Sequence, residues 1–466
     1  MKIDISKFSL HPLSYGDPNG SVFQHDDELY RVISEDQIDF YLELFERGII
    51  DELIDKKCLI PSTIADVNIE EKWLVIRHES VAFPSYCFEW CGEMLKEAAR
   101  VVLKLEQNLL RHGLTLTDPH PVNVLFQGVK PFWVDFGSLA RVGAPNAGWS
   151  SEMFAAHFTR PLKIMSAGHD RLARCLLYEA NLNGVSQREA EAITDGSWIR
   201  VRKAVKTRAG NVVRRVVPIP MRPLARRAKR LLAHSRDYSS INSKISSETK
   251  EIESIKLPQP TTRWSDYDNV WFPPFDSHRD WTEKHFVIEQ ILAEKRPRTV
   301  LDLGANRGWY SQLAARHGAL VVALDSDSPA IGKLYRDARR DGLSILPLIH
   351  DFRSLHPTVP LGRTPGVPPW ERFRCDMVFA LALVHHLVFT NSLTFDYVVK
   401  VFSSFTDKWL VTEFVGREDR HIPDWVDGWP PWYSLDNFIS AIKKEFKIVE
   451  VLPSNEDHRR LLLCSR

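Results

Sequence analysis

The stretch that decides the fold of the carboxyl-terminal half is TVLDLGANRGWYSQLAARHGALVVALDSD, residues 299–327. Its two apolar runs, at 299–303 and 319–324, have the composition of buried strands, and Trp309 to Arg316 has a helical period. The turn between the first run and the helix is made largely of small residues, namely Gly304, Ala305 and Gly308. Such a turn lets a ligand lie against backbone N–H groups at the start of a helix. The stretch therefore predicts strand, turn, helix and strand around a ligand site.

The second apolar run ends on Asp325, about 20 positions after the first glycine, where a Rossmann-like unit presents a carboxylate to ribose hydroxyls. The spacing of the turn is D-x-G-x-N-x-G, which differs from the dinucleotide G-x-G-x-x-G. Its four defined positions are Asp302, Gly304, Asn306 and Gly308. This pattern resembles motif I of class I S-adenosylmethionine-dependent methyltransferases.

The resemblance implies S-adenosylmethionine as cofactor. In that family the glycine loop holds the amino-acid part of the cofactor, which implies this role for Gly304 and Gly308, and the acid after the second strand holds the ribose, which implies Asp325. An acid after the third strand often contacts the adenine amine, which implies Asp351. The cofactor-binding residues predicted in this way are Asp302, Gly304, Asn306, Gly308, Asp325 and Asp351.

The remaining carboxyl-terminal sequence predicts five strand–helix units followed by a β-hairpin. This order favours an α/β, Rossmann-like, seven-stranded methyltransferase sheet over a dehydrogenase fold. His385 and His386 follow the fourth predicted strand, where open α/β sheets place ligand chemistry. A neutral imidazole there can take a proton from a substrate hydroxyl, so both are candidate catalytic residues. The alternative is that one histidine caps the helix and lines the cofactor wall.

The amino-terminal half begins with a predicted hairpin at 20–33, and a long amphipathic helix is expected from Phe88 to His112. Residues 114–139 then place Asn123 five positions after Asp118, and Asp135-Phe136-Gly137 follows. This resembles the catalytic-loop and D-F-G segments of the protein-kinase-like and aminoglycoside-phosphotransferase-like fold. The resemblance implies that Asp118 orients a hydroxyl and that Asn123 and Asp135 hold magnesium, so Mg-ATP is a second candidate ligand.

Departures from the kinase-like pattern favour a degenerate scaffold over an active phosphotransferase. The matching strand, ELYRVI, has Arg31 where the family has a lysine, and an arginine fork does not simply replace an ammonium ion. Leu116 and Thr117 precede Asp118 in place of histidine and arginine. The plainer alternative is a surface turn, because Asp-Pro-His-Pro is also common turn chemistry.

The chain of 466 residues is longer than one hydrophobic core usually allows. We predict a kinase-like domain at 1–198, with an N-lobe at 1–86 and a helical C-lobe at 87–198. A basic helical segment and linker would follow at 199–260, and a class I methyltransferase domain at 261–466. The N-terminus lacks an apolar signal region and no long apolar run occurs, so a cytoplasmic location is expected. The six cysteines have no zinc spacing, which predicts packed, reduced thiols and no metal site.

Residues 200–236 contain 13 Lys or Arg and no acidic residue, although the net charge of the chain is only +1. Three interpretations remain open: a patch for nucleic acid or another anionic surface, a docking site for an acidic substrate, and a solvated positive face. The run has no nucleic-acid motif, so nucleic acid is disfavoured. Four cations alternate with apolar residues as in an amphipathic helix that contacts the inner face of a membrane, namely Arg226, Arg227, Lys229 and Arg230. Residues 237–259 read as a linker.

A kinase-like half joined to a methyltransferase half resembles bacterial methyltransferases of the nodulation and surface-glycan type. That resemblance implies that the methyl acceptor is a hydroxyl group of a carbohydrate, a glycolipid or another small molecule. If the basic segment recruits the acceptor, the acceptor should also have an anionic group. Two alternatives remain open: a bifunctional kinase-methyltransferase acting on a glycan, and a non-enzymatic binding module in a glycan-assembly complex.

Overall fold

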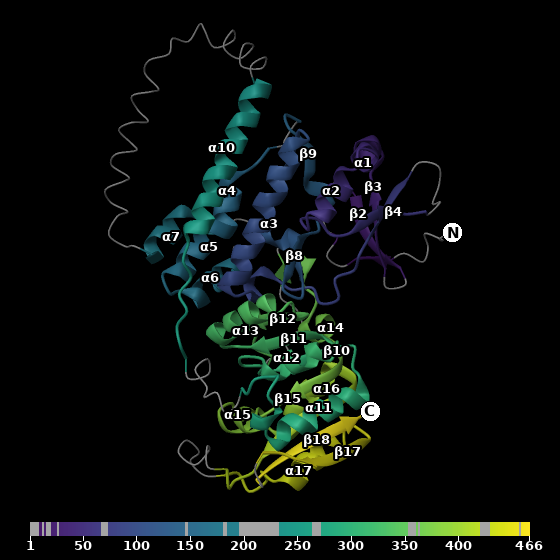
Figure 1. Ribbon diagram of the computed structural model, residues 1–466, viewed down its shortest axis with the longest axis vertical. Helices are drawn as coiled ribbons and strands as arrows, with labels where there is room; N and C mark the ends of the chain where they lie inside the picture. Colours follow the sequence, from purple (N-terminus) through teal and green to yellow (C-terminus); the bar gives the residue numbers. More distant parts are fainter. Residues whose placement is uncertain are drawn as a thin grey trace.

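The structure, a computed structural model, describes residues 9–11, 14, 20–25, 28–66, 73–144, 148–179, 184–194, 233–262, 272–352, 360–361, 364–419, 429–455 and 458–466. In these ranges the chain builds a seven-stranded sheet from its carboxyl-terminal half and a smaller sheet with a helical layer from its amino-terminal half (Figure 1).

The seven-stranded sheet has the strand order β12-β11-β10-β15-β16-β18-β17. Only β18 runs antiparallel to its two neighbours; the other pairs are parallel. This is the strand order of class I methyltransferases, so the predicted fold class is confirmed. The strands are β10 (Thr299–Leu303), β11 (Leu320–Asp325), β12 (Ile345–Ile349), β15 (Cys375–Ala380), β16 (Thr406–Val415), β17 (Ile448–Pro453) and β18 (Arg459–Ser465).

Helices follow the parallel strands and cover their apolar faces, which is why the central strands are almost continuously apolar. The helix after β10 begins at Trp309 as predicted. The helices of this half are α11 (Glu283–Lys295), α12 (Trp309–Arg316), α13 (Ser328–Arg340), α14 (Pro369–Arg372), α15 (Val384–Phe389), α16 (Phe395–Ser404) and α17 (Leu435–Ile442).

The amino-terminal sheet has the order β1-β2-β3-β5-β4 and is antiparallel. The predicted hairpin is confirmed as β2 (Gly20–His25) and β3 (Glu28–Ile33). Residues 80–84 form bends and do not join this sheet, and Pro84 lacks the N–H that a ladder needs. The remaining strands are β1 (Ser9–Leu10), β4 (Ser62–Ile64) and β5 (Leu74–His78).

Helix α3 (Gly92–Arg111) is the central element of the amino-terminal helical layer. It starts four residues later than predicted, because Cys87–Glu89 form a separate 3₁₀ turn. Two short antiparallel pairs flank the acidic loops: β6 (Leu114–Leu116) with β9 (Leu139–Arg141), and β7 (Val124–Gln127) with β8 (Lys130–Trp133). The other helices are α1 (Ile38–Glu46), α2 (Ile49–Asp55), α4 (Ser151–Phe154), α5 (Arg160–Ser166), α6 (Asp170–Glu179) and α7 (Gln187–Thr194), with a π-helical turn at Ala155–Thr159.

The linker interpretation of residues 237–254 is wrong, because they belong to helix α10 (Ala233–Ser254), which packs along α3. Apolar side chains recur at helical spacing and are buried at Ile241, Ile245 and Ile252. Glu248 completes the stripe by accepting a hydrogen bond from Trp149 Nε1 at 2.8 Å. The Ser- and Lys-rich composition of the segment indicated a linker, because the apolar residues form only a narrow stripe.

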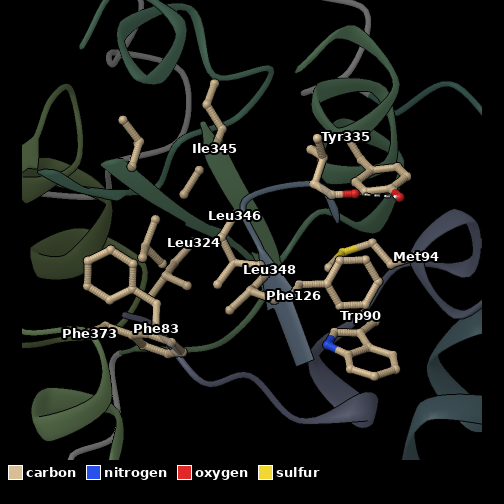
Figure 2. Packing of buried hydrophobic residues seen from close by; sticks show 14 of the residues in the cluster. Phe83, Trp90, Met94, Phe126, Leu324, Tyr335, Ile345, Leu346, Leu348 and Phe373 are labelled. Atoms are coloured by element: carbon tan, nitrogen blue, oxygen red, sulfur yellow. Dashed lines mark hydrogen bonds between the residues drawn. The ribbon is translucent and has the colours of Figure 1, made fainter. Parts of the chain in front are cut away.

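The two halves share a continuous apolar core at the β12 edge of the large sheet (Figure 2). Phe126, on β7, packs edge-on against Tyr335 of α13, and Tyr335 Oη donates a hydrogen bond to Val129 O at 3.3 Å. Beside this core, Arg372 makes two hydrogen bonds to Glu89, at 2.9 and 2.5 Å, and both side chains are buried. The amino-terminal half is therefore packed onto the methyltransferase-type sheet.

The basic segment lies largely outside the described residues, and with it Arg226, Arg227, Lys229 and Arg230. Among the helices that the structure describes, none combines the length and apolar character needed to cross a membrane. All six cysteines are free thiols; five are buried and Cys175 is exposed, which corrects the expectation that all are packed.

Candidate functional site

The predicted glycine loop connects the carboxyl end of β10 to α12 and wraps toward the end of β11. The N–H groups of Gly304 and Ala305 both donate to Leu324 O, at 2.9 and 3.1 Å. Gly304, Asn306 and Gly308 have positive φ, of 72°, 53° and 70°. Asparagine is one of the few residues with a side chain that tolerates this conformation, which explains why it stands in a glycine-rich turn.

Asp325 joins the end of β11 to this loop. One carboxylate oxygen accepts the N–H of Asn306 at 2.8 Å, and the other accepts the N–H of Asp327 at 2.8 Å. Burial raises the pKa of Asp325, while these N–H groups lower it. The structure thus brings Asp325 and the glycine loop together at the carboxyl edge of the sheet.

Asp302 lies at the bottom of the same site and is 4% exposed. Its carboxylate accepts a hydrogen bond from Ser311 Oγ at 2.6 Å. Burial raises the pKa of Asp302 to about 6, and the nearby charge of Asp325 acts in the same direction. The side chain therefore holds the first turn of α12 against β10.

Asp351 is exposed and follows the end of β12, the strand next to β11. The preceding residue, His350, donates its backbone N–H to Asp325 O at 3.0 Å, which ties the two strand ends together. His350 Nδ1 also lies 3.6 Å from Glu89 of the amino-terminal half. Asp351 thus sits at the same sheet edge as Asp325, on the adjacent strand end.

His385 and His386 lie in the first turn of α15, after β15, with ring centroids 4.1 Å apart. His385 is 6% exposed, whereas His386 is partly exposed. Burial lowers the pKa of His385 well below its ordinary value, and the charges of His386, Arg459 and Lys284 lower it further. Its imidazole is therefore neutral at physiological pH. Two residues before His385, the side chain of Leu383 lies 3.1 Å from the position that a Cβ on Gly304 would take.

A buried charge cluster lies beside the glycine loop, and its pairing of Lys284 with Glu413 was not predicted from the sequence. Lys284 Nζ, on α11, donates to Glu413 Oε2 on β16 at 2.6 Å, and both residues are buried. Ser454 Oγ donates to the other oxygen of Glu413 at 2.7 Å. The ammonium group lies 5.1 Å from the ring centroid of Tyr310, the second residue of α12. Charged residues are seldom buried without a partner, and the sequence does not show which residue is the partner. A lysine on a helix and a glutamate in an apolar strand therefore do not reveal this pair.

The residues of the loop fit the amino-acid and ribose parts of S-adenosylmethionine. Asn306 Oδ1 is buried and accepts no hydrogen bond in the described part of the chain, so it is a ready acceptor for an ammonium or hydroxyl group. The positive φ angles at Gly304 and Gly308 keep side chains out of the turn. Asp325 adds a carboxylate about 20 positions after the first glycine, which is the sequence spacing at which Rossmann-like units place a ribose-binding acid.

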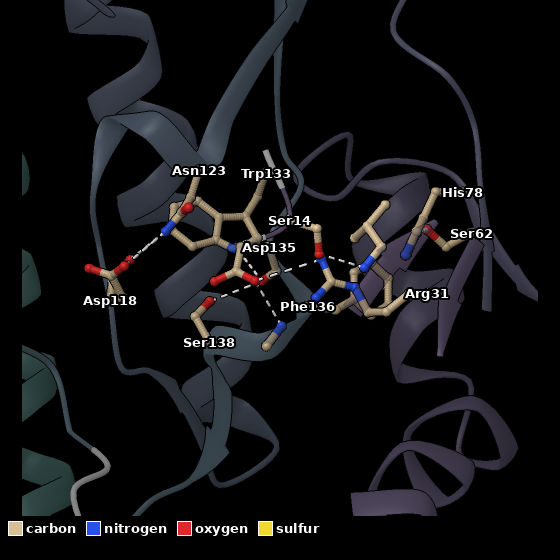
Figure 3. Close-up of polar contacts among 12 residues, drawn as sticks. Ser14, Arg31, Ser62, His78, Asp118, Asn123, Trp133, Asp135, Phe136 and Ser138 are labelled. Atoms are coloured by element: carbon tan, nitrogen blue, oxygen red, sulfur yellow. Dashed lines mark hydrogen bonds and ion pairs between the residues drawn. The ribbon is translucent and has the colours of Figure 1, made fainter. Parts of the chain in front are cut away.

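The kinase-like residues also gather in space, around β7, β8 and β3 (Figure 3). Asn123 Nδ2 donates to Asp118 Oδ2 at 3.2 Å. Asp135 Oδ1 accepts the N–H of Gly137 at 2.9 Å and lies 3.8 Å from Nη2 of Arg31, which is 5% exposed. A fixed guanidinium therefore stands beside the carboxylate that would hold magnesium in an active kinase. Burial raises the pKa of Asp118.

Comparison with known proteins gives one long sequence match. The chain is 24% identical over 471 residues to nodulation protein NoeA of Rhizobium meliloti (strain 1021), covering 94% of this chain and 92% of that protein. No protein-family model matches.

Comparison with solved structures gives matches to methyltransferases over about two fifths of the chain. Magnesium protoporphyrin IX methyltransferase (ChlM) from Synechocystis PCC 6803 with bound SAM is 15% identical, with a TM-score of 0.28, and the match covers 39% of this chain and 77% of that one. The bifunctional kinase-methyltransferase WbdD is 16% identical, with a TM-score of 0.32, and the match covers 43% and 44% of the two chains.

Proposed function

We propose that the protein is an S-adenosylmethionine-dependent methyltransferase that acts on a hydroxyl group. The observation that carries the proposal is the junction of Asp325 with the glycine loop through the N–H of Asn306, at the carboxyl edge of a sheet with methyltransferase strand order. Asp325 would hold the ribose hydroxyls, Asp351 the adenine amine, and the loop with Asn306 the amino-acid part. S-adenosylmethionine supplies an already activated methyl group, so alignment provides much of the rate.

His385 is the proposed proton acceptor for the hydroxyl. Its imidazole lies after β15, beside the loop, and its lowered pKa keeps a ring nitrogen unprotonated and able to accept a proton, while making it a weak base. The Lys284–Glu413 pair would position α11 over the loop and exclude water from the site. His386, more exposed, would face the acceptor entrance.

The proposed acceptor is a carbohydrate, glycolipid or other small-molecule hydroxyl. Two things support this class: the resemblance of the whole chain to methyltransferases of the nodulation and surface-glycan type, and the 24% identity to a nodulation protein over nearly the full length. We also propose that residues 200–236 recruit an anionic acceptor and contact the inner face of a membrane. This part of the proposal rests on the positive charge of the segment.

Titration calorimetry with S-adenosylhomocysteine tests the cofactor site. Asp325→Ala should weaken binding at least about tenfold, since hydrogen bonds to charged groups contribute about 1.5–3 kcal/mol. Asp396→Ala, which removes an exposed carboxylate on α16, is the matched control and should bind as the wild type does. His385→Ala should keep the affinity and lower kcat. Wild-type protein that does not bind, or unchanged binding in Asp325→Ala, refutes the assignment.

A bifunctional kinase-methyltransferase is the second candidate, favoured by the clustering of Asp118, Asn123 and Asp135. The same calorimetric series with Mg-ATP separates it from a degenerate scaffold. Binding that needs magnesium and disappears in Asp135→Ala supports the kinase, whereas the Arg31–Asp135 contact favours a scaffold without bound nucleotide. A non-enzymatic binding module in a glycan-assembly complex is the third candidate, and any measured methyl transfer excludes it.

A further inference from the structure

The end of β12, where Asp351 is proposed to meet the adenine amine, lies at one edge of the large sheet. Among the strands that the structure describes, β12 pairs with β11 alone. The residues on either side of Asp351 are both anchored. The backbone N–H of His350 donates to Asp325 O at 3.0 Å. Phe352 is 7% exposed and packs in the apolar core. The position of Asp351 therefore depends on what holds these two neighbours.

The side chain of His350 is held from the amino-terminal half. Its Nδ1 lies 3.6 Å from Glu89 Oε1, and its ring centroid lies 6.4 Å from that of Phe373, edge-on. Its Nε2 is buried and has no hydrogen-bond partner among the residues that the structure describes. The carboxylate of Glu89 favours the tautomer with a proton on Nδ1, because an N–H at that position lies nearest the negative charge. Glu89 is therefore the polar group that orients this ring.

Glu89 is itself fixed from several directions. Its carboxylate accepts the backbone N–H of Tyr86 at 2.8 Å and two N–H groups of Arg372 at 2.9 and 2.5 Å. Arg372 in turn donates to Pro84 O at 2.9 Å. A buried carboxylate with three charge-assisted or backbone donors has a well-defined position. Its contact with His350 therefore links the position of the amino-terminal half to the end of β12.

We propose that the amino-terminal half completes the cofactor site, with Glu89 and His350 as positioning residues that set where Asp351 meets the adenine amine. This inference rests on the proposed methyltransferase function. Adenine has an amine that donates to a carboxylate, whereas hypoxanthine has in its place a carbonyl oxygen that a carboxylate repels. A correctly placed Asp351 therefore favours a ligand with adenine, and a displaced Asp351 loses this preference.

Calorimetry with S-adenosylhomocysteine and with S-inosylhomocysteine, which differ only in the base, tests the positioning. The wild type should prefer S-adenosylhomocysteine at least about tenfold, because only its base donates a hydrogen bond to the carboxylate. Glu89→Gln should reduce the preference to about threefold or less, because the ring of His350 loses the charge that orients it. His350→Phe should have the same effect while the Glu89–Arg372 pair stays intact, so the test does not depend on the folding of Glu89→Gln.

Two further variants separate positioning from stability. Glu93→Gln removes another ion pair that joins the halves, between α3 and Arg336 of α13, and should keep the wild-type preference. Glu89→Gln combined with Arg372→Met removes the buried charge as well, so stability should recover while the preference for adenine stays low. A merely structural role of Glu89 would restore stability and preference together.

Four outcomes overturn the inference. Wild-type protein that binds neither ligand overturns the proposed function together with this inference. Equal affinity of the wild type for both ligands shows that Asp351 does not recognise the amine. An unchanged preference in either Glu89→Gln or His350→Phe, with binding retained, overturns this inference alone. An equal loss of preference in Glu93→Gln also overturns it, because the general packing of the halves then accounts for the effect.

Discussion

At the scale of single residues, the site depends on acidic groups that are costly to bury. Asp302 is the clearest case, since it is almost completely buried and its pKa is raised to about 6 from an ordinary value of 3.8. In the described part of the chain Ser311 is its hydrogen-bond donor, and Lys284 is near enough to act through its charge. Asp302 lies at the bottom of the proposed cofactor site, and acidic side chains with shifted pKa values in such sites are often functional.

This pKa shift makes the stability of the protein depend on pH. The folded state holds the proton of Asp302 more tightly than the unfolded state, so the contribution of Asp302 to stability falls as pH rises from about 4 to about 6. Asp302→Asn keeps an acceptor for Ser311 and removes this loss. The free energy of unfolding of the variant minus that of the wild type should therefore increase over that interval, by on the order of 3 kcal/mol. Urea unfolding at a series of pH values measures the difference, and a flat difference contradicts the prediction.

At the scale of elements, the β10–α12 turn is constrained by the helix packed behind it. A Cβ on Gly308 would lie 2.4 and 2.5 Å from the two terminal carbons of Leu334, on α13. Gly308 also has φ of 70°. The turn therefore needs glycine for two separate reasons, conformation and close approach, and both help to fix where the loop meets Asp325.

Gly308→Ala should destabilise the protein by about 2–5 kcal/mol, combining left-handed strain of about 1–2 kcal/mol with overpacking of about 1–3 kcal/mol. Gly342→Ala is the control, because Gly342 has φ of 66° and a Cβ there meets no atom within 4 Å, so it adds strain alone. Adding Leu334→Ala to Gly308→Ala should improve S-adenosylhomocysteine binding over the single variant. Equal unfolding free energies for Gly308→Ala and Gly342→Ala would show that Leu334 does not limit the turn.

The elements also show what the sequence could predict. The strand–turn–helix–strand conformation around the glycine loop was predictable because its signals, from Asp302 to Asp325, lie within one such unit. The Lys284–Glu413 pair was not, since its members are 129 residues apart and neither belongs to a local pattern. Helix α10 was missed for a different reason: its apolar stripe is one residue wide, and its polar remainder resembles a linker in composition.

At the scale of the whole molecule, Glu89 and Arg372 connect the halves across 283 positions of sequence. Both are buried, and Arg372 also donates to Pro84 O at 2.9 Å and to Val367 O at 3.0 Å. The Arg372 guanidinium lies 4.1 Å from the ring centroid of Tyr86. This pair therefore fixes the amino-terminal half next to His350, at the strand end that leads into Asp351.

Glu89→Gln should lower the free energy of unfolding by about 3 kcal/mol, because it leaves the Arg372 charge buried without its counterion. Asp407→Asn, which breaks an exposed pair with Arg374, should change it by less than about 1 kcal/mol. Combining Glu89→Gln with Arg372→Met should restore most of the loss, since the buried charge is then gone. Urea unfolding measures all three variants, and a cost for Glu89→Gln as small as that of the control would contradict the role of the pair.

Because α10 packs on α3, the chain between positions 195 and 232 connects two parts of the amino-terminal half. Helix α7, before it, packs on α5, and α10, after it, packs on α3, so both ends of this segment attach to the amino-terminal half. The covalent passage between the halves comes later, after Ile255, at residues 257–262, where Thr262 Oγ1 donates a hydrogen bond to Asp327. A protease cut within 195–232 would leave two fragments that divide the amino-terminal half, with its last helix on the same fragment as the methyltransferase-type sheet. The boundary at which the two halves can be separated by recombination or by expression therefore lies near position 256.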